Sequence, residues 1–445
     1  MLKKVIFIIL IIICTVFTFG YFRYNRTVNT ANKIPVSADV VIRMNLREIE
    51  YTMLKDVVKH PFLYFKSIKN NQHKKAFSLF DEVVFPSNVF FYSNNNVLKN
   101  TWVSTTIEIK NKMRLLSFFN QDKFVKKTLE KADYFINKKT VYLINKNQLR
   151  IVFNLDEISN IETKLNTILN TNNYLNDENS IVQKLKNSKE LIAISTKSKS
   201  FLELGVDENE ISIIGELSEK NMPFLSYKTS VTNRSVLSFS GKVKKTFLFD
   251  YLKKSSKDNF EKLTNVSLDS IQTHWNGDFN VKLASFIYKK DTILTYEYDD
   301  DFNKIATTTI QKTIVPDLNI SLGGSYIFTY LSSKKAIKNI NGEKILVVNP
   351  LFKTYADKNS KELFLYSKKA VHANYYKNNQ HVNNKFSLFF DVEEYLKTQE
   401  DSLIISNDYL TGIKNVKAVI TKNNKVDFKV VFKNTPQSFI YKMLK

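Results

Sequence analysis

The sequence predicts the α+β fold class: an N-terminal transmembrane helix followed by mixed, mainly antiparallel sheets with repeated strand–helix units. Three observations lead to this prediction. An uncharged apolar run occupies residues 5–22, alternation of apolar and polar residues recurs along the rest of the chain, and several alternating segments lead directly into helical spacing.

The apolar run of residues 5–22 has the length of a membrane span. As a helix it would extend about 27 Å, close to the thickness of the hydrocarbon core of a bilayer. We interpret it as an uncleaved signal-anchor. A cleaved signal peptide is one alternative, but no small-residue cleavage pattern follows the run. A lipoprotein signal acylated at Cys14 is another, but the bulky Ile13 stands where such signals carry a small residue.

The residues on either side of the run predict the topology of the chain. Lys3 and Lys4 precede it, whereas Arg23 and Arg26 follow it, so the charge bias is slight, and the short N-terminal flank favours the cytoplasm. We therefore expect a single-pass membrane protein whose bulk lies on the periplasmic side of the inner membrane. Its predicted regions are a cytoplasmic flank at 1–4, the anchor at 5–22, a polar tether at 23–33, a first α+β region at 34–220 and a second at 235–445.

The composition favours a folded region without disulfides after the apolar run. Hydrophobic residues make up 43% and aromatic residues 13% of the chain, which is enough for a substantial core. Glycine (9) and proline (7) are scarce, which argues against low-complexity architectures. The one cysteine, Cys14, lies in the apolar run, so the remaining chain can hold neither a disulfide nor a thiolate metal site.

The net charge of +23 has two interpretations. An anionic partner would explain it, and beside a membrane that partner would be anionic lipid rather than nucleic acid. The lysines, however, occur in short runs across the whole chain and never form a basic tail, which favours a compositional origin.

A strand that runs into a helix recurs along the chain. Residues 39–50, 149–161 and 385–396 show it most clearly, and residues 236–252 show a weaker version. Acidic residues such as Glu48 and Asp391 stand at the expected helix starts, where the helix dipole favours negative charge. The spacing is irregular, so the repeat is not a solenoid.

Alternating segments that flank short polar turns predict hairpins. The predicted pairs are 102–109 with 113–119, 139–144 with 149–153, 280–288 with 292–298, and 416–421 with 425–432. Helical spacing predicts helices near 47–68, 122–133, 157–170, 246–256, 302–314 and 391–399, and a further strand is expected at 326–331.

The sequence contains no recognisable catalytic motif. P-loop, dinucleotide-binding, nucleophile-elbow and zinc-protease patterns are absent, and no two of the five histidines have helical spacing. The acidic stretch 297–303 lacks the glycine and the final glutamate of a calcium loop. We therefore expect no catalytic residues, no metal and no cofactor.

His274, Trp275 and Asp278 form the most distinctive local group, around an Asn-Gly turn. They are the candidate residues for a binding cleft, although such a stretch is more often an Asn-Gly turn with the tryptophan, here Trp275, packed against a sheet. The leading functional hypothesis is a non-catalytic scaffold or partner-binding component of the bacterial envelope. A module for lipid or another hydrophobic ligand and a hydrolase with a non-local site are the alternatives.

Overall fold

The computed structural model divides the chain into two compact units, residues 1–221 with 434–445 and residues 222–433. It describes residues 33–62, 79–84, 86–94, 102–120, 123–129, 132–154, 161–169, 173–231, 235–250, 254–298, 302–369, 380–399 and 410–433, with 28, 30, 64 and 300. The predicted division into 34–220 and 235–445 stays a prediction, as does the tether at 23–33.

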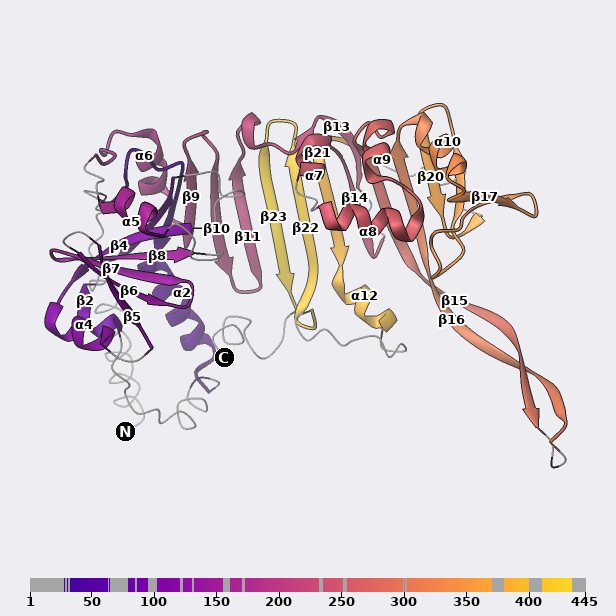
Figure 1. Ribbon diagram of the computed structural model, residues 1–445, viewed down its shortest axis with the longest axis horizontal. Helices are drawn as coiled ribbons and strands as arrows, with labels where there is room; N and C mark the ends of the chain where they lie inside the picture. Colours follow the sequence, from indigo (N-terminus) through magenta and orange to yellow (C-terminus); the bar gives the residue numbers. More distant parts are fainter. Residues whose placement is uncertain are drawn as a thin grey trace, which may run out of the picture. The chain divides into compact units, whose positions relative to one another are not determined.

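The first unit is an antiparallel sheet with short helices (Figure 1). Its elements are β1 (Val40–Asn45), α2 (Leu46–Lys59), β2 (Val83–Val84), β3 (Asn88–Ser93), β4 (Trp102–Ile109), α4 (Lys112–Phe119), β5 (Val125–Leu129), β6 (Ala132–Asn137), β7 (Thr140–Asn145), β8 (Gln148–Asn154), α5 (Ile161–Leu169), α6 (Ser180–Asn187), β9 (Ile192–Thr196), β10 (Phe201–Asp207) and β11 (Glu210–Glu216).

The second unit has the same character. Its elements are β12 (Phe224–Leu225), β13 (Tyr227–Val231), β14 (Leu237–Val243), α7 (Lys245–Asp250), α8 (Lys254–Thr264), α9 (Leu268–His274), β15 (Asp278–Tyr298), β16 (Lys304–Gly323), α10 (Ser325–Ser333), β17 (Ile337–Ile340), β18 (Glu343–Leu346), β19 (Tyr355–Lys358), β20 (Glu362–Tyr366), β21 (Gln380–Asp391), α12 (Val392–Gln399), β22 (Ile413–Thr421) and β23 (Lys425–Phe432).

The two units share one topology. In the first, the antiparallel strand order is β11-β10-β9-β1-β3-β4-β8-β7-β6-β5. In the second, it is β23-β22-β21-β14-β15-β16-β20-β19-β18-β17, which is the same order when the strands are matched along the chain. A helix stands at matching places, α4 between β4 and β5 and α10 between β16 and β17.

The predicted α+β fold class is therefore wrong: among the described residues a large antiparallel sheet dominates, with short helices attached to it. A strand does lead into a helix at β1–α2, β14–α7 and β21–α12. The repeating structural element, however, is the whole unit with its long-range strand order and not the strand–helix pair. One strand and one short helix cannot bury an apolar face alone.

The predicted transmembrane helix gains no support from the structure. Within the described part of the chain, no helix is both long enough and apolar enough to cross a bilayer. The predicted anchor at residues 5–22 lies outside the described residues.

Each unit has its own hydrophobic core. In the first, Tyr134, Leu143 and Leu165 are fully buried in one cluster, and Leu115, Phe119 and Phe135 lie in a second cluster beneath α4. In the second unit, the core contains the fully buried Leu363 and the buried side chains of the helix α10. It includes Trp275, Ile327, Phe328, Leu331 and Leu365.

Two buried arginines hold helix ends in the first unit. Arg43 on β1 donates to the carbonyl oxygens of Leu185 and Ser188 at the end of α6, the latter at 2.9 Å. Arg150 on β8 donates to the carbonyl of Ile168 at the end of α5. The last carbonyls of a helix have no partner within it, so each guanidinium supplies one.

Several local predictions are confirmed by the structure. The hairpins β7–β8 and β22–β23 form as expected. Helices occur at α2, α5, α7 and α12, within or beside the predicted ranges.

Other local predictions are wrong. Residues 113–119 and 326–331 lie in the helices α4 and α10, not in strands, because their buried side chains follow helical spacing. Within the predicted helices 122–133 and 302–314, residues 125–129, 132–133 and 304–314 lie in strands. The predicted turn at 289–291 is the middle of β15, which continues to Tyr298 paired with β16.

Candidate functional site

The three residues His274, Trp275 and Asp278 lie together where α9 ends and β15 begins. Trp275 is buried in the core of the second unit, and its indole Nε1 donates to the backbone oxygen of Asp278 at 2.6 Å. The ring centroid of His274 lies 5.5 Å from that of Tyr330 on α10. The structure thus brings the three together in a packed turn, and their role in ligand binding stays a prediction.

Carboxylates gather beside this turn. Lys242 forms an ion pair with Asp278 at 2.9 Å, and these two residues oppose one another across β14 and β15. Burial raises the pKa of Glu362 on β20, and the charge of Asp278 raises it further. Burial likewise raises the pKa of Tyr227 to about 12, with smaller contributions from Asp278 and Glu362. These carboxylates favour the neutral form of the Tyr227 hydroxyl, and the carboxylate of Asp278 is paired with Lys242.

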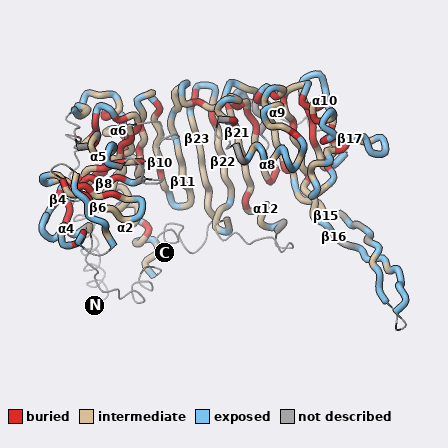
Figure 2. Tube along the Cα trace, in the orientation of Figure 1, coloured by how far each residue is buried: buried red, intermediate tan, exposed pale blue. Residues whose placement is uncertain are grey.

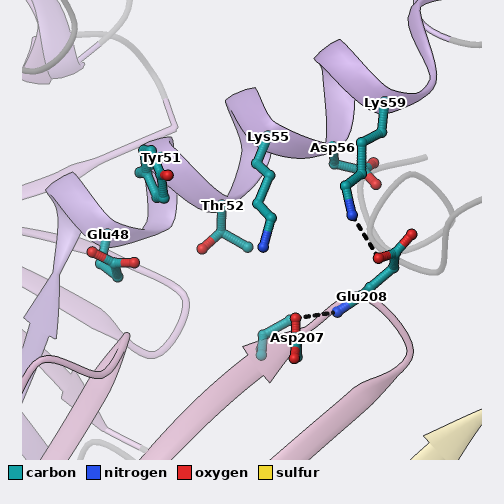
Figure 3. Close-up of a pocket in the computed structure, with 9 residues that line it drawn as sticks. Glu48, Tyr51, Thr52, Lys55, Asp56, Lys59, Asp207 and Glu208 are labelled. Atoms are coloured by element: carbon teal, nitrogen blue, oxygen red, sulfur yellow. Dashed lines mark hydrogen bonds and ion pairs between the residues drawn. The ribbon is translucent and has the colours of Figure 1, made fainter. Parts of the chain in front are cut away.

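A small cleft lies between α2 and the end of β10 in the first unit (Figure 3). It measures about 100 Å³, well below the roughly 300 Å³ at which small-molecule sites begin. Lys59 and Glu208 close one end through an ion pair at 2.5 Å. Burial raises the pKa of Glu48 in its wall, and the nearby Glu190 adds to this. The cleft suits a few ordered waters better than a ligand.

The carboxylate of Asp56 beside this cleft does not complete a hydrolytic set. His60 Nε2 lies 4.0 Å from Asp56 Oδ1, which is longer than a hydrogen bond, and Tyr64 Oη donates to the other carboxylate oxygen. Across the described residues, no group of three or more histidine, cysteine, aspartate or glutamate side chains is arranged to hold a metal ion.

A second cleft of about 340 Å³ lies where β1 begins and β9 ends. Hydroxyl and amide groups line it: Asn221 Nδ2 donates to Ser198 Oγ at 2.6 Å, and Thr196 Oγ1 lies 2.9 Å from that same oxygen. Its charged lining residues are Asp39, Lys197 and Lys220. Six of its seven lining residues are polar or charged, whereas a cavity for an apolar ligand is lined mainly by apolar side chains.

The most unusual surface is a two-stranded arm in the second unit (Figure 1). Residues 286–298 of β15 and 304–316 of β16 pair with each other in continuous register, beyond the segments that pair with β14 and β20. At about 3.3 Å per residue, these strands extend roughly 40 Å. Figure 2 shows that the arm is exposed along most of its length. In the matching hairpin of the first unit, the connection between β3 and β4 comprises residues 94–101.

The two faces of the arm differ in chemistry. Even-numbered residues of both strands share one face, because the register pairs even with even. This apolar face of the arm bears five large side chains that are between 50 and 66% exposed: Tyr288, Leu294, Tyr296, Tyr298 and Ile310. On the opposite face, Thr295 Oγ1 lies 2.8 Å from Thr309 Oγ1 and 3.1 Å from Thr307 Oγ1, in a ladder of hydroxyl groups.

The sequence contains a signal for the arm. Residues 292–298 alternate with tyrosine and leucine at even positions, and residues 307–309 are three consecutive threonines, which favour strands. Two other patterns conceal the arm: the polar residues 289–291 resemble a turn, and residues 302–314 have helical apolar spacing.

No protein-family model and no curated protein matches the chain. Among solved structures, three crystal forms of TP0453 share weak similarity. Form I has a TM-score of 0.27 at 10% identity, covering 46% of this chain and 91% of its own. Form III has a TM-score of 0.25 at 12% identity, covering 54% of this chain and 88% of its own. Form IV has a TM-score of 0.22 at 10% identity, covering 76% of this chain and 92% of its own. At TM-scores this low the likeness identifies neither a shared fold nor a function.

Proposed function

We propose that the chain is a non-catalytic binding component of the bacterial cell envelope, and that the apolar face of the arm is its contact surface. The carrying observation is the row of five exposed large side chains, Tyr288, Leu294, Tyr296, Tyr298 and Ile310, along one face of a projecting ribbon. Contiguous apolar surface of this kind marks binding sites in soluble domains.

The construction of the arm supports the same proposal. A two-stranded ribbon alone is marginally stable in water, and this one keeps its large apolar side chains exposed. A partner that covers the apolar face would remove these side chains from water and stabilise the ribbon. The uncharged run of residues 5–22 supports export from the cytoplasm, and hence a partner in the envelope.

The absence of enzymatic activity belongs to this proposal. Asp56 and His60 lie too far apart for a hydrogen bond, and the two described clefts are small or polar. These observations favour binding over hydrolysis and over storage of an apolar ligand.

Paired variants of the two arm faces test the proposal. Leu294→Asn with Tyr296→Asn makes the apolar face polar, and Glu297→Asn with Thr309→Asn changes the opposite face at a similar distance from the sheet. We expect the first variant to lose most of the envelope proteins or lipids that co-isolate with the full chain after chemical cross-linking. The second should retain them. Equal recovery from both variants would refute the arm as a contact surface.

A further inference from the structure

The chemistry of the apolar face of the arm points to a specific partner. Its described side chains include two lysines, Lys290 and Lys304, both exposed, and no carboxylate. The exposed carboxylate of Glu297 lies on the opposite face. Among the described exposed side chains, the lysines and most of the large apolar groups therefore share one face, whereas Glu297 and Ile305 lie on the other.

Tyrosine, aliphatic side chains and lysine together suit the interface between lipid headgroups and acyl chains. Tyrosine places an apolar ring and a polar hydroxyl across that boundary, and lysine reaches anionic headgroups with its ammonium group while its stem stays on apolar surface. Lys304 Nζ lies 4.1 Å from the ring centroid of Tyr296, so its stem already follows that face.

We infer that the apolar face of the arm docks flat on an anionic lipid bilayer. This inference rests on the proposed function, for which it names the partner. Asp300 in the connecting turn is exposed, so a tip-first approach would bring a carboxylate towards the anionic surface. A flat approach instead places Tyr288, Tyr296 and Tyr298 at the headgroups along one side of the ribbon.

The two lysines set the expected size of the effect. Each lysine near an anionic surface contributes about 1 kcal/mol, or about fivefold in the equilibrium between docked and free arm. Replacing both with glutamine should therefore lower that equilibrium roughly 30-fold, and higher salt should weaken docking of the unaltered arm.

A position-specific fluorophore in the full chain tests the inference. Cys14→Ser removes the single native cysteine, after which Tyr298→Cys or Glu297→Cys accepts an environment-sensitive nitrobenzoxadiazole label. The full chain is mixed with phosphatidylcholine vesicles with and without about 30% phosphatidylglycerol. We expect a blue shift at position 298 in the anionic vesicles alone, and little change at position 297.

Charge variants complete the test. Lys290→Gln with Lys304→Gln should abolish most of the shift at position 298. Lys334→Gln with Lys338→Gln makes the same change of charge at exposed sites away from the arm and should leave it intact. An equal shift in neutral vesicles, or equal shifts at positions 297 and 298, would overturn the inference.

The outcome for the partner is separable from that for the proposed function. If the vesicles give no shift but the apolar-face variant still loses co-isolated proteins, the partner is a protein and the lipid assignment fails alone. If neither the vesicles nor the co-isolation respond to changes in the apolar face, both fail.

Discussion

Arg43→Met should strongly destabilise the first unit. The Arg43 side chain is only 1% exposed, and its guanidinium donates to the carbonyls of Leu185 and Ser188 at the end of α6. Burial lowers the pKa of the guanidinium, and the charge of Glu203 partly opposes this. Methionine preserves much of the stem but offers no donor, so the two carbonyls lose their partner.

The magnitude follows from the two hydrogen bonds. A hydrogen bond to a charged group contributes about 1.5 kcal/mol, so losing two lowers the free energy of unfolding by about 3 kcal/mol. Replacing a buried ion pair with apolar groups can be stabilising. Here, however, only the guanidinium donor is removed, and the carbonyl acceptors of Leu185 and Ser188 stay buried without it. With a urea dependence of about 2.5 kcal/mol per molar, the unfolding midpoint should fall by about 1 M.

The two tryptophans allow the assay to report on each unit. Trp102 is buried in the core of the first unit and Trp275 in the core of the second. With Trp275→Phe as background, tryptophan fluorescence during urea unfolding follows the first unit alone. Arg114→Met, at an arginine whose side chain is 70% exposed, is the control and should shift the midpoint little. A midpoint for Arg43→Met equal to that of the control would refute the reasoning.

Three further predictions concern single positions. Gly324→Ala should cost more than about 2 kcal/mol in thermal or urea unfolding, because φ is +132° and a Cβ would lie 2.2 Å from the carbonyl oxygen of His274; Gly412→Ala, with open space around it, should cost under about 0.5 kcal/mol. Folding raises the pKa of Tyr227 to about 12, so the free energy of unfolding should be constant below about pH 10 and fall as the pH rises towards 12. Tyr227→Phe should flatten that part of a plot of stability against pH. Asn111→Ala removes the side-chain cap of α4 and should lower the melting temperature of the first unit, at a cost of about 1 kcal/mol.

The sequence predicts structure best where local chemistry decides it. The turn between β22 and β23 places Asn424 at a φ of +64°, a conformation that asparagine tolerates, and the flanking strands alternate cleanly. At α12, the acidic residues Glu393 and Glu394 mark the first turn, as expected from the helix dipole.

Prediction fails where distant partners decide the structure. Residues 302–314 show apolar spacing that resembles a helix, but β15 provides a strand partner from residue 304 onwards, and pairing prevails. Residues 326–330 are aromatic or β-branched, yet they lie in α10 because Ile327, Phe328 and Leu331 face the core at helical spacing. The shared topology of the two units arises from strand orders that join distant segments, which single-sequence periodicity does not reveal.

The same reasoning explains what was missed at the candidate site. His274 and Trp275 attract notice because histidine (5) and tryptophan (2) are rare in this chain, whereas the arm is built from common tyrosine, threonine and isoleucine. The chemistry of each face of the arm follows from the strand register. Only the pairing of β15 with β16 places Tyr296 and Ile310 on one face and Thr309 on the other.

Photo-cross-linking in intact cells tests the central claim most directly. A photoreactive amino acid replaces either Tyr296 on the apolar face of the arm or its neighbour Glu297 on the opposite face, at nearly the same distance from the sheet. If the apolar face is the contact surface, irradiation should yield a discrete adduct, to lipid or to protein, from position 296 and little from position 297. Adducts of equal yield from both positions, or from neither, would contradict the account.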